Sequence, residues 1–204
     1  MNVSTQTPLR EDAFALDDKT KIDLIAKHFK EIMNVLGLDM TDDSLRDTPR
    51  RVANMYINEA FRGLNPANKP HVTLFQNKYN YKQMVIEKDI SFYSNCEHHF
   101  VPIFGKAHIG YISSGAVVGL SKLNRIVDYY SKRPQVQERL TIQIANELMD
   151  ALKTDDVAVV MEAKHLCVSS RGIKDDTSLT TTSALFGKFL DADTRSEFIR
   201  LIGK

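Results

Sequence analysis

"QMVIEKDISFYSNCEHHFVPIFGKAHIGYI", residues 83–112, contains the segments that decide the fold of this chain. Two parts of it, 83–94 and 102–112, are rich in Val, Ile, Phe and Tyr, which predicts two β-strands. Between them, four consecutive residues, Cys96 to His99, supply a thiol, a carboxylate and two imidazoles. The stretch therefore predicts two neighbouring strands whose connection carries chemically reactive side chains.

The segments that follow predict an α+β architecture. We expect two helices at about 121–131 and 134–152, two strands within 156–166 and 178–190, and a short helix at 194–202. Pro134 suits the first turn of its helix, and Thr194 is a candidate cap for the last one. The resulting order is ββααββ, an antiparallel sheet with helices on one face. Such a unit leaves strand edges to cover, so oligomerisation is expected.

The N-terminal third has a different, helical character. Residues 1–16 predict a flexible tail, and apolar residues at helical spacing predict a helix over about 18–36. A second helix begins near "DTPRRV", where Thr48 can cap it and Pro49 suits its first turn. The linker "GLNPANKPH" separates this part from the rest. We therefore divide the chain into a tail (1–16), a helical subdomain (17–70) and a catalytic domain (71–204).

Composition excludes several classes of function. The 204 residues include 27 basic and 26 acidic side chains, which argues against a general nucleic-acid binder. No apolar run approaches the roughly 18 residues that a membrane span needs, and the polar start lacks the apolar segment of a signal peptide. We expect a cytoplasmic protein, in which the two cysteines stay as thiols or thiolates.

These two cysteines suggest a metal site. Cys96 and His99 form a C-x-x-H pair, and Cys167 follows His165 by two residues. Thiolate and imidazole are preferred ligands of Zn²⁺, and three protein ligands with one open position are the catalytic pattern. His98 and His165 would then be acid–base groups beside the ion. A closed structural site with His165 as fourth ligand, or two free cysteines near surface histidines, are the alternatives.

Several long blocks together resemble the GTP cyclohydrolase I family, the zinc-dependent type. They are "DTPRRV" (47–52), "SNCEHHFVPIFGKAHIGYI" (94–112), "GLSKLNRIVDYYSKRPQVQERLT" (119–141), "KHLCVSSRGI" (164–173) and "TTTSALFG" (180–187). The resemblance implies the tunnelling fold and a homodecamer of two pentameric rings with active sites between subunits. The implied reaction converts GTP and water to 7,8-dihydroneopterin triphosphate and formate.

The resemblance also implies a role for each matching residue. The implied zinc ligands are Cys96, His99 and Cys167, and the implied catalytic residues are His98, His165 and Ser121. Glu138 is the implied guanine anchor, with Gln137 as a further substrate contact. The implied triphosphate clamp consists of Lys122, Arg125, Arg171 and Arg51. Asn54 departs from relatives that carry a further basic residue there, which affects only the outer phosphate contacts.

Helix geometry adds an expectation about Glu138. At about 100° per residue, Glu138 falls within the apolar arc of the helix, whereas Arg139 and Gln143 fall on the opposite side. A carboxylate that points toward a core needs a partner. Guanine offers two parallel donors, N1–H and the amino group; the alternative partners are the helix N-terminus or a nearby arginine.

Two rival functions fit parts of the pattern. The nitrile reductase of queuosine synthesis, also a tunnelling-fold enzyme, uses NADPH and a nucleophilic cysteine without zinc. The C-E-H-H block and the second cysteine near His165 argue against it, and no step of the implied reaction requires a nicotinamide. A zinc-stabilised binding module without catalysis is the rival from a different class.

Overall fold

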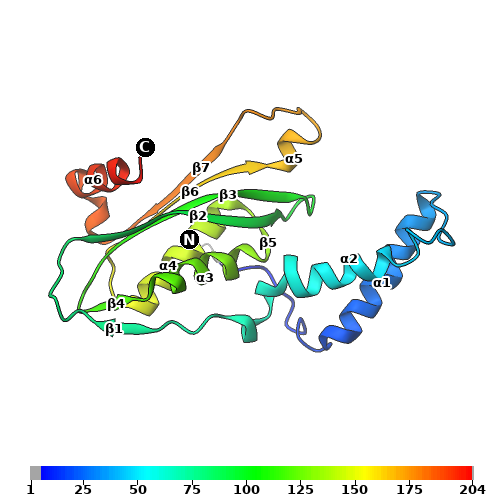
Figure 1. Ribbon diagram of the computed structural model, residues 1–204, viewed down its shortest axis with the longest axis horizontal. Helices are drawn as coiled ribbons and strands as arrows, with labels where there is room; N and C mark the ends of the chain where they lie inside the picture. The colour runs from blue at the N-terminus through cyan, green and yellow to red at the C-terminus, as the bar shows by residue number, and fades with distance from the viewer. Residues whose placement is uncertain (1–5, 204) are drawn as a thin grey trace.

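A curled, mostly antiparallel sheet is the frame of the molecule, in an α+β arrangement (Figure 1). The computed structural model describes residues 6–203, so residues 1–5 of the expected tail lie outside the described part. The sheet has five strands in the order β5-β2-β3-β6-β7. They are β2 (Met84–Cys96), β3 (Pro102–Ile112), β5 (Pro134–Gln135), β6 (Val157–His165) and β7 (Thr180–Leu185).

The two strands predicted from residues 83–112 are confirmed as β2 and β3, which pair antiparallel. Alternate residues of β2 are buried in its second half, from Ile90 to Cys96, as the period of two along a strand requires. Strand β3 then pairs with β6, and β6 with β7, both antiparallel. Consequently β6 lies between two partners, and six of its nine residues are buried.

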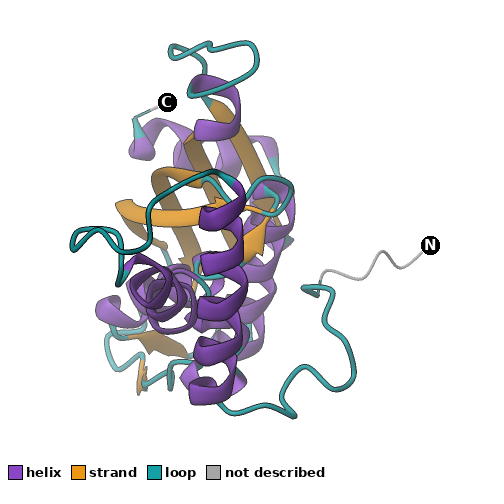
Figure 2. Cartoon of the chain, turned by 90° about the vertical axis from the view of Figure 1, so that its right-hand side faces the viewer, coloured by secondary structure: helices purple, strands orange, loops and turns teal. Residues whose placement is uncertain are grey.

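Helices α3 (Leu120–Ser131) and α4 (Gln137–Leu152) cover one face of the sheet (Figures 1 and 2). Their apolar residues share the main core with alternate residues of β6 such as Val159 and Met161. The expectation of helices on one face alone needs a correction. Helix α6 (Ala192–Ile202) covers part of the opposite face, where Phe198 packs with Ala158 and Val160 of β6.

Two short strands interrupt the predicted ββααββ order. Strand β4 (Ala116–Val118) precedes α3 and pairs with β1 (Leu74–Gln76) in a separate two-stranded sheet. Strand β5 occupies the position predicted as the first turn of a helix, and it pairs in parallel with Asn95 and Cys96. Helix α4 therefore begins at Gln137, three residues later than predicted, because Pro134 and Gln135 extend the sheet instead.

Smaller differences concern helix starts. Asp191, rather than Thr194, occupies the N-cap position of α6, and Asp47 occupies that of α2 (Thr48–Met55); neither side chain forms a cap hydrogen bond. Helix α2 continues as η1 (Tyr56–Ala60), η2 (Arg62–Leu64) and η3 (Pro66–Asn68).

The last predicted strand is shorter than expected. After β7, η4 (Gly187–Leu190) replaces the end of the segment predicted as strand to residue 190. Gly187 has φ +56°, and a Cβ there would lie 2.3 Å from Asp156 Oδ1, so the turn requires glycine.

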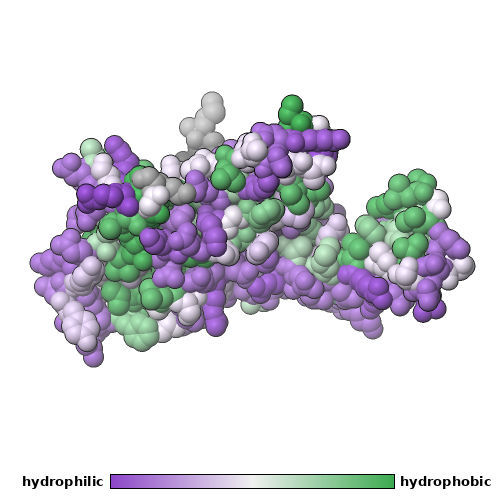
Figure 3. Space-filling view, turned by 45° about the horizontal axis from the view of Figure 1, so that its top comes forward, coloured by the Kyte–Doolittle hydropathy of each residue, from purple (hydrophilic) through white to green (hydrophobic). Residues whose placement is uncertain are grey.

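Helix α1 (Asp18–Val35) matches its predicted range closely and packs against α2, away from the sheet (Figure 1). Near the end of α1, large apolar side chains stay exposed, and Figure 3 shows apolar surface gathered there. They include Ile32, Val35 and Leu36, which are 52%, 86% and 69% exposed.

Within residues 6–203, no helix has both the length and the apolar character that crossing a membrane requires. The division at residues 16 and 70 stays a prediction.

Candidate metal centre

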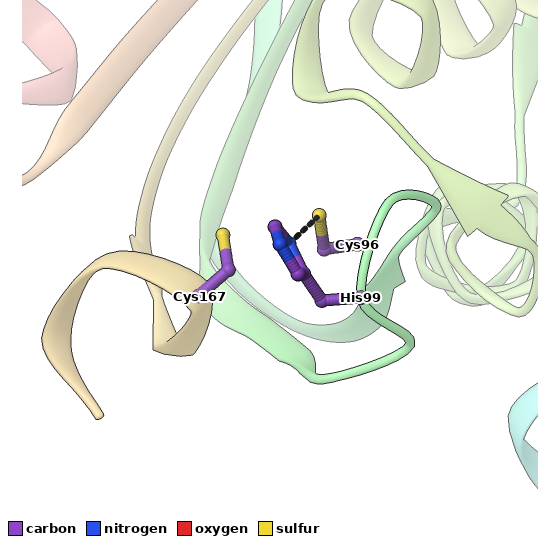
Figure 4. Close-up of side chains that lie close together, drawn as sticks. All are labelled: Cys96, His99 and Cys167. Carbon is purple, nitrogen blue, oxygen red and sulfur yellow. Dashed lines mark hydrogen bonds between the residues drawn. The ribbon is translucent and has the colours of Figure 1, made fainter. Parts of the chain in front are cut away.

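Three side chains from two distant segments meet at one end of the sheet. Cys96 ends β2, His99 lies in the turn before β3, and Cys167 lies in α5 (Leu166–Ser169), directly after β6. Their ligand atoms all lie within 4.8 Å of one another, and the Cys96 Sγ to His99 Nδ1 distance is 4.0 Å. In Figure 4 the three side chains point toward a common centre.

The turn between β2 and β3 places Cys96 and His99 on the same side. The Phe100 amide donates to the Cys96 carbonyl at 2.8 Å, which closes one helix-like turn, and Phe100 itself is left-handed with φ +54°. Residues three apart in such a turn are neighbours. The Phe100 ring packs on Phe61, with centroids 5.1 Å apart, so this turn is anchored to the helical part.

Strand register explains why Cys167 joins them from so far along the chain. His165 lies opposite Ile103, which is close to the start of β3 and therefore close to the turn. Helix α5 begins directly after His165 and carries Cys167 toward Cys96. The predicted grouping of Cys96, His99 and Cys167 is thus confirmed as a spatial cluster.

The cluster has the donor set and spacing that zinc requires. In a tetrahedral site, bond lengths near 2.3 Å to sulfur and 2.0–2.1 Å to nitrogen put neighbouring ligand atoms roughly 3.6 Å apart. Burial, with the neighbouring Cys96 thiol, raises the pKa of Cys167. Two thiolates this close repel each other, and a cation between them removes that penalty. The residues therefore fit a metal ion.

His165 lies near the cluster but has a different partner. Its Nε2 lies 2.7 Å from Gln137 Oε1, and within residues 6–203 it does not belong to the cluster of potential ligands. The arrangement thus favours three ligands over the closed four-ligand alternative. Burial lowers the pKa of His165, and the nearby Glu138 carboxylate opposes this shift.

His98 lies directly beside the thiolate position. Its Nδ1 is 3.7 Å from Cys96 Sγ, and its Nε2 is 3.8 Å from Glu97 Oε1. The side chain is exposed, so it can reach a bound molecule. An exposed imidazole next to a candidate metal site has the position that a proton donor to a substrate needs.

The expected burial of Glu138 was wrong. Glu138 is exposed, whereas Gln137 before it is 1% exposed. Ala145, two turns further along in nearly the same direction, is buried, so the helical direction was predicted correctly. Glu138 lies in the first turn of α4, near the strand ends, where that direction reaches solvent. Gln143 was also placed wrongly, because it is buried and accepts a hydrogen bond from Gln135.

Arg171 is the one member of the predicted clamp that contacts the cluster. Its Nη1 lies 3.1 Å from His99 Nε2. A neutral imidazole has one lone pair. His99 therefore cannot bind a cation through Nδ1 while Nε2 accepts from Arg171, and metal binding through Nδ1 would release the guanidinium.

The other predicted substrate contacts lie elsewhere in the chain. Helix α3 carries Ser121, Lys122 and Arg125, and it begins next to the Tyr111 end of β3, since Val118 N donates to Tyr111 Oη. The cluster of Cys96, His99 and Cys167 lies at the opposite end of this 11-residue strand, roughly 30 Å away at about 3.3 Å per residue. Arg51 is exposed on α2.

A polar brace behind the cluster was missed from the sequence. Arg139 forms an ion pair with Glu97, donates to Gln135 Oε1 at 3.0 Å and donates to the Pro134 carbonyl at 3.1 Å. The Glu97 amide in turn donates to the Gln135 carbonyl at 3.0 Å. The brace joins the turn that carries Cys96 and His99 to the start of α4. Glu97 lies in the C-E-H-H block and Arg139 lies in "QERLT", but nothing in their spacing indicated that they form an ion pair.

Comparison with known proteins identifies the family. A family profile described as GTP cyclohydrolase I matches residues 25–203. A protein named GTP cyclohydrolase 1 from Flavobacterium johnsoniae is 57% identical over 98% of this chain and 89% of its own length. Proteins of the same name from Enterobacter sp. and Salmonella arizonae are 51% and 52% identical over 97% of this chain and 89% of theirs. The chain belongs to the GTP cyclohydrolase I family.

Proposed function

We propose that the protein converts GTP and water to 7,8-dihydroneopterin triphosphate and formate, the first step of pterin and folate biosynthesis. The meeting of Cys96, His99 and Cys167, in a chain similar to GTP cyclohydrolases over nearly its whole length, carries this proposal. The reaction opens the purine ring at C8, which requires an activated water and several proton transfers.

Cys96, His99 and Cys167 would hold one zinc ion. When bound, zinc supplies a Lewis acid that makes water nucleophilic near neutral pH. The donor set supports zinc over magnesium or calcium, because thiolates and imidazole suit zinc whereas carboxylates suit the others. Because His99 is exposed, a substrate can reach this site from the solvent.

His98 and His165 would move protons on either side of the reacting ring. The position of His98 next to the cluster suits protonation of N7 as water adds to C8. His165, partly buried and with its pKa lowered, is mostly neutral near pH 7 and suits later transfers during the rearrangement of the ribose. The exposed Glu138 carboxylate, close enough to influence His165, would accept the two parallel donors of guanine.

The triphosphate would be bound by Arg171 together with Lys122, Arg125 and Arg51, with Ser121 near the ribose. Within one chain, α3 begins at the other end of β3 from the metal cluster. This separation supports a site completed by a neighbouring subunit. The uncovered apolar side chains near the end of α1, and the sheet edges, support association. We propose the tunnelling fold and a homodecamer of two pentameric rings.

Incubation of zinc-loaded protein with GTP tests the function. We expect formate release and, after oxidation of the product, neopterin fluorescence, in both cases dependent on metal. ATP is the matched control, because adenine lacks the paired donors that Glu138 would bind. Stoichiometric zinc without formate would indicate a zinc-stabilised binding module. NADPH oxidation with a nitrile substrate would indicate the reductase.

A further inference from the structure

The first residue of α4, Gln137, carries a buried side-chain amide whose polar atoms contact protein groups. It is 1% exposed. Its Nε2 lies 3.1 Å from the Met161 carbonyl oxygen, 2.9 Å from that of Thr180 and 3.1 Å from Thr182 Oγ1. Its Oε1 lies 2.7 Å from His165 Nε2. Gln137 thus links the start of α4 to strands β6 and β7 and to one candidate catalytic histidine.

The chemistry of these contacts fixes the orientation of the amide. Backbone carbonyl oxygens can only accept hydrogen bonds, so the end of the Gln137 side chain that faces Met161 and Thr180 must be its NH₂ group. The other end, which faces His165, must be the carbonyl oxygen. An amide oxygen can only accept, so His165 must donate through Nε2. The carbonyl oxygens of Met161 and Thr180 alone determine this orientation of the amide.

The surroundings also keep the amide from turning. Thr141 Oγ1 donates to the main-chain carbonyl of Gln137 at 2.7 Å and lies 2.6 Å from Thr182 Oγ1, which itself accepts from the Gln137 side chain. A rotation of the Gln137 side chain would break its bonds to β6 and β7 together. Buried polar networks with all partners in place are rigid. Gln137 is therefore held by groups other than the histidine that it contacts.

We propose that Gln137 is a positioning residue, which holds His165 in the tautomer with its proton on Nε2 and leaves Nδ1 as the ring atom that exchanges protons with the substrate. The part concerning the substrate rests on the proposed function. A neutral imidazole has one N–H and one lone pair. Fixing one nitrogen therefore assigns the chemistry to the other, as the orienting carboxylate does in Ser-His-Asp sites. This role replaces the expected substrate contact of Gln137.

The tautomer can be observed directly in the zinc-loaded protein. Solid-state NMR of protein labelled with ¹⁵N at histidine distinguishes protonated from unprotonated ring nitrogens. The His165 signals are assigned by their loss in His165→Asn. We expect a proton on Nε2 in the wild type and a redistribution toward Nδ1 in Gln137→Met. A wild-type His165 with unprotonated Nε2 overturns the proposal.

Kinetics separate positioning from substrate contact. Gln137→Met should lower kcat for GTP about ten- to hundredfold, within the range of general acid–base contributions, and leave KM unchanged. In the His165→Asn background the same change should cause no further loss. Thr154→Val, which removes a buried hydrogen bond to the Ile112 carbonyl at the far end of β3, is the control and should leave both kcat and the tautomer unchanged.

A raised KM with normal kcat in Gln137→Met would overturn the positioning role in favour of a substrate contact. The proposed function and the positioning role of Gln137 can be refuted independently of each other. If zinc-loaded protein releases no formate from GTP, the proposed function fails, and the ¹⁵N spectrum still decides which nitrogen of His165 carries the proton.

Discussion

The brace behind the metal cluster leads to a quantitative prediction for Arg139→Met. Methionine keeps much of the length and volume of the side chain but removes its charge and all its hydrogen-bond donors. The Arg139 side chain is 14% exposed, and that of its partner Glu97 is 28% exposed. The substitution therefore leaves a partly buried carboxylate without its cation, one residue away from Cys96.

The cost can be worked from the contacts of the guanidinium with Glu97 and Gln135. Loss of a hydrogen-bonded charge partner costs about 1.5–3 kcal/mol, and partial exposure of Glu97 holds the figure near 2 kcal/mol. Gln135, which is fully buried, loses a donor to its Oε1, for about 1 kcal/mol more. The sum, about 3 kcal/mol, lowers Tm by roughly 6–12 °C for a chain of this size. Zinc affinity should fall about 10- to 100-fold, as for other residues that orient metal ligands.

Two measurements check these magnitudes. Thermal unfolding is compared at equal subunit concentration, because association is linked to stability, and zinc affinity is measured by competition with a chelator. Arg133→Met is the matched control: Arg133 donates to the Gly63 carbonyl and stacks on Tyr129, so its loss should destabilise the fold but spare the metal. Equal zinc affinity in Arg139→Met and wild type would refute the bracing role.

Other predictions concern the metal, the proton donor, the base and the assembly. Cys167→Ser should keep the fold but lose zinc and activity, because it removes a ligand; full zinc by elemental analysis would contradict this. His98→Ser should keep zinc, but its rate of formate release should fall about 10²–10⁴-fold. Near-normal turnover would show that His98 has no catalytic role. Glu138→Ala should weaken GTP binding about 10- to 100-fold by calorimetry, from a loss of about 1.5–3 kcal/mol; unchanged affinity would mean that guanine is bound elsewhere. Because Lys122 lies far from the metal within one chain, a sedimentation-verified monomer should be inactive.

The sequence predicted those parts of the fold that depend on local pattern. Segments rich in Val, Ile, Phe and Tyr identified β2 and β3, and helical spacing identified α1 to within one residue of its observed end. Chemistry identified Cys96, His99 and Cys167, because thiols and imidazoles at strand ends have few roles as specific as metal binding. In each case, the information lies within about a dozen neighbouring residues or in the side-chain type itself.

Features that depend on pairing between distant segments were not predictable in this way. Pro134 and Gln135 look like the start of a helix, yet they add a parallel strand next to Cys96 because the end of β2 offers unpaired backbone groups there. The exposure of Glu138 has a similar origin. Helix periodicity gives the direction of a side chain, but not whether the neighbouring layer extends far enough to cover it.

The contact between Gln137 and His165 shows that strand pairing determines the roles of residues whose presence at the site was expected from the sequence. Both residues were expected at the site from the family blocks, one as a substrate contact and the other as an acid–base group. Their roles depend on a register that neither block contains: β6 ends at His165 next to the start of β7, where Thr180 and Thr182 fix the Gln137 amide. A buried amide whose NH₂ group faces strand carbonyls has only its oxygen left for the histidine. The helix start, the two strand ends and the protonation of His165 are thus parts of one arrangement, and the chemistry assigned to Nδ1 follows from the way in which the sheet is paired.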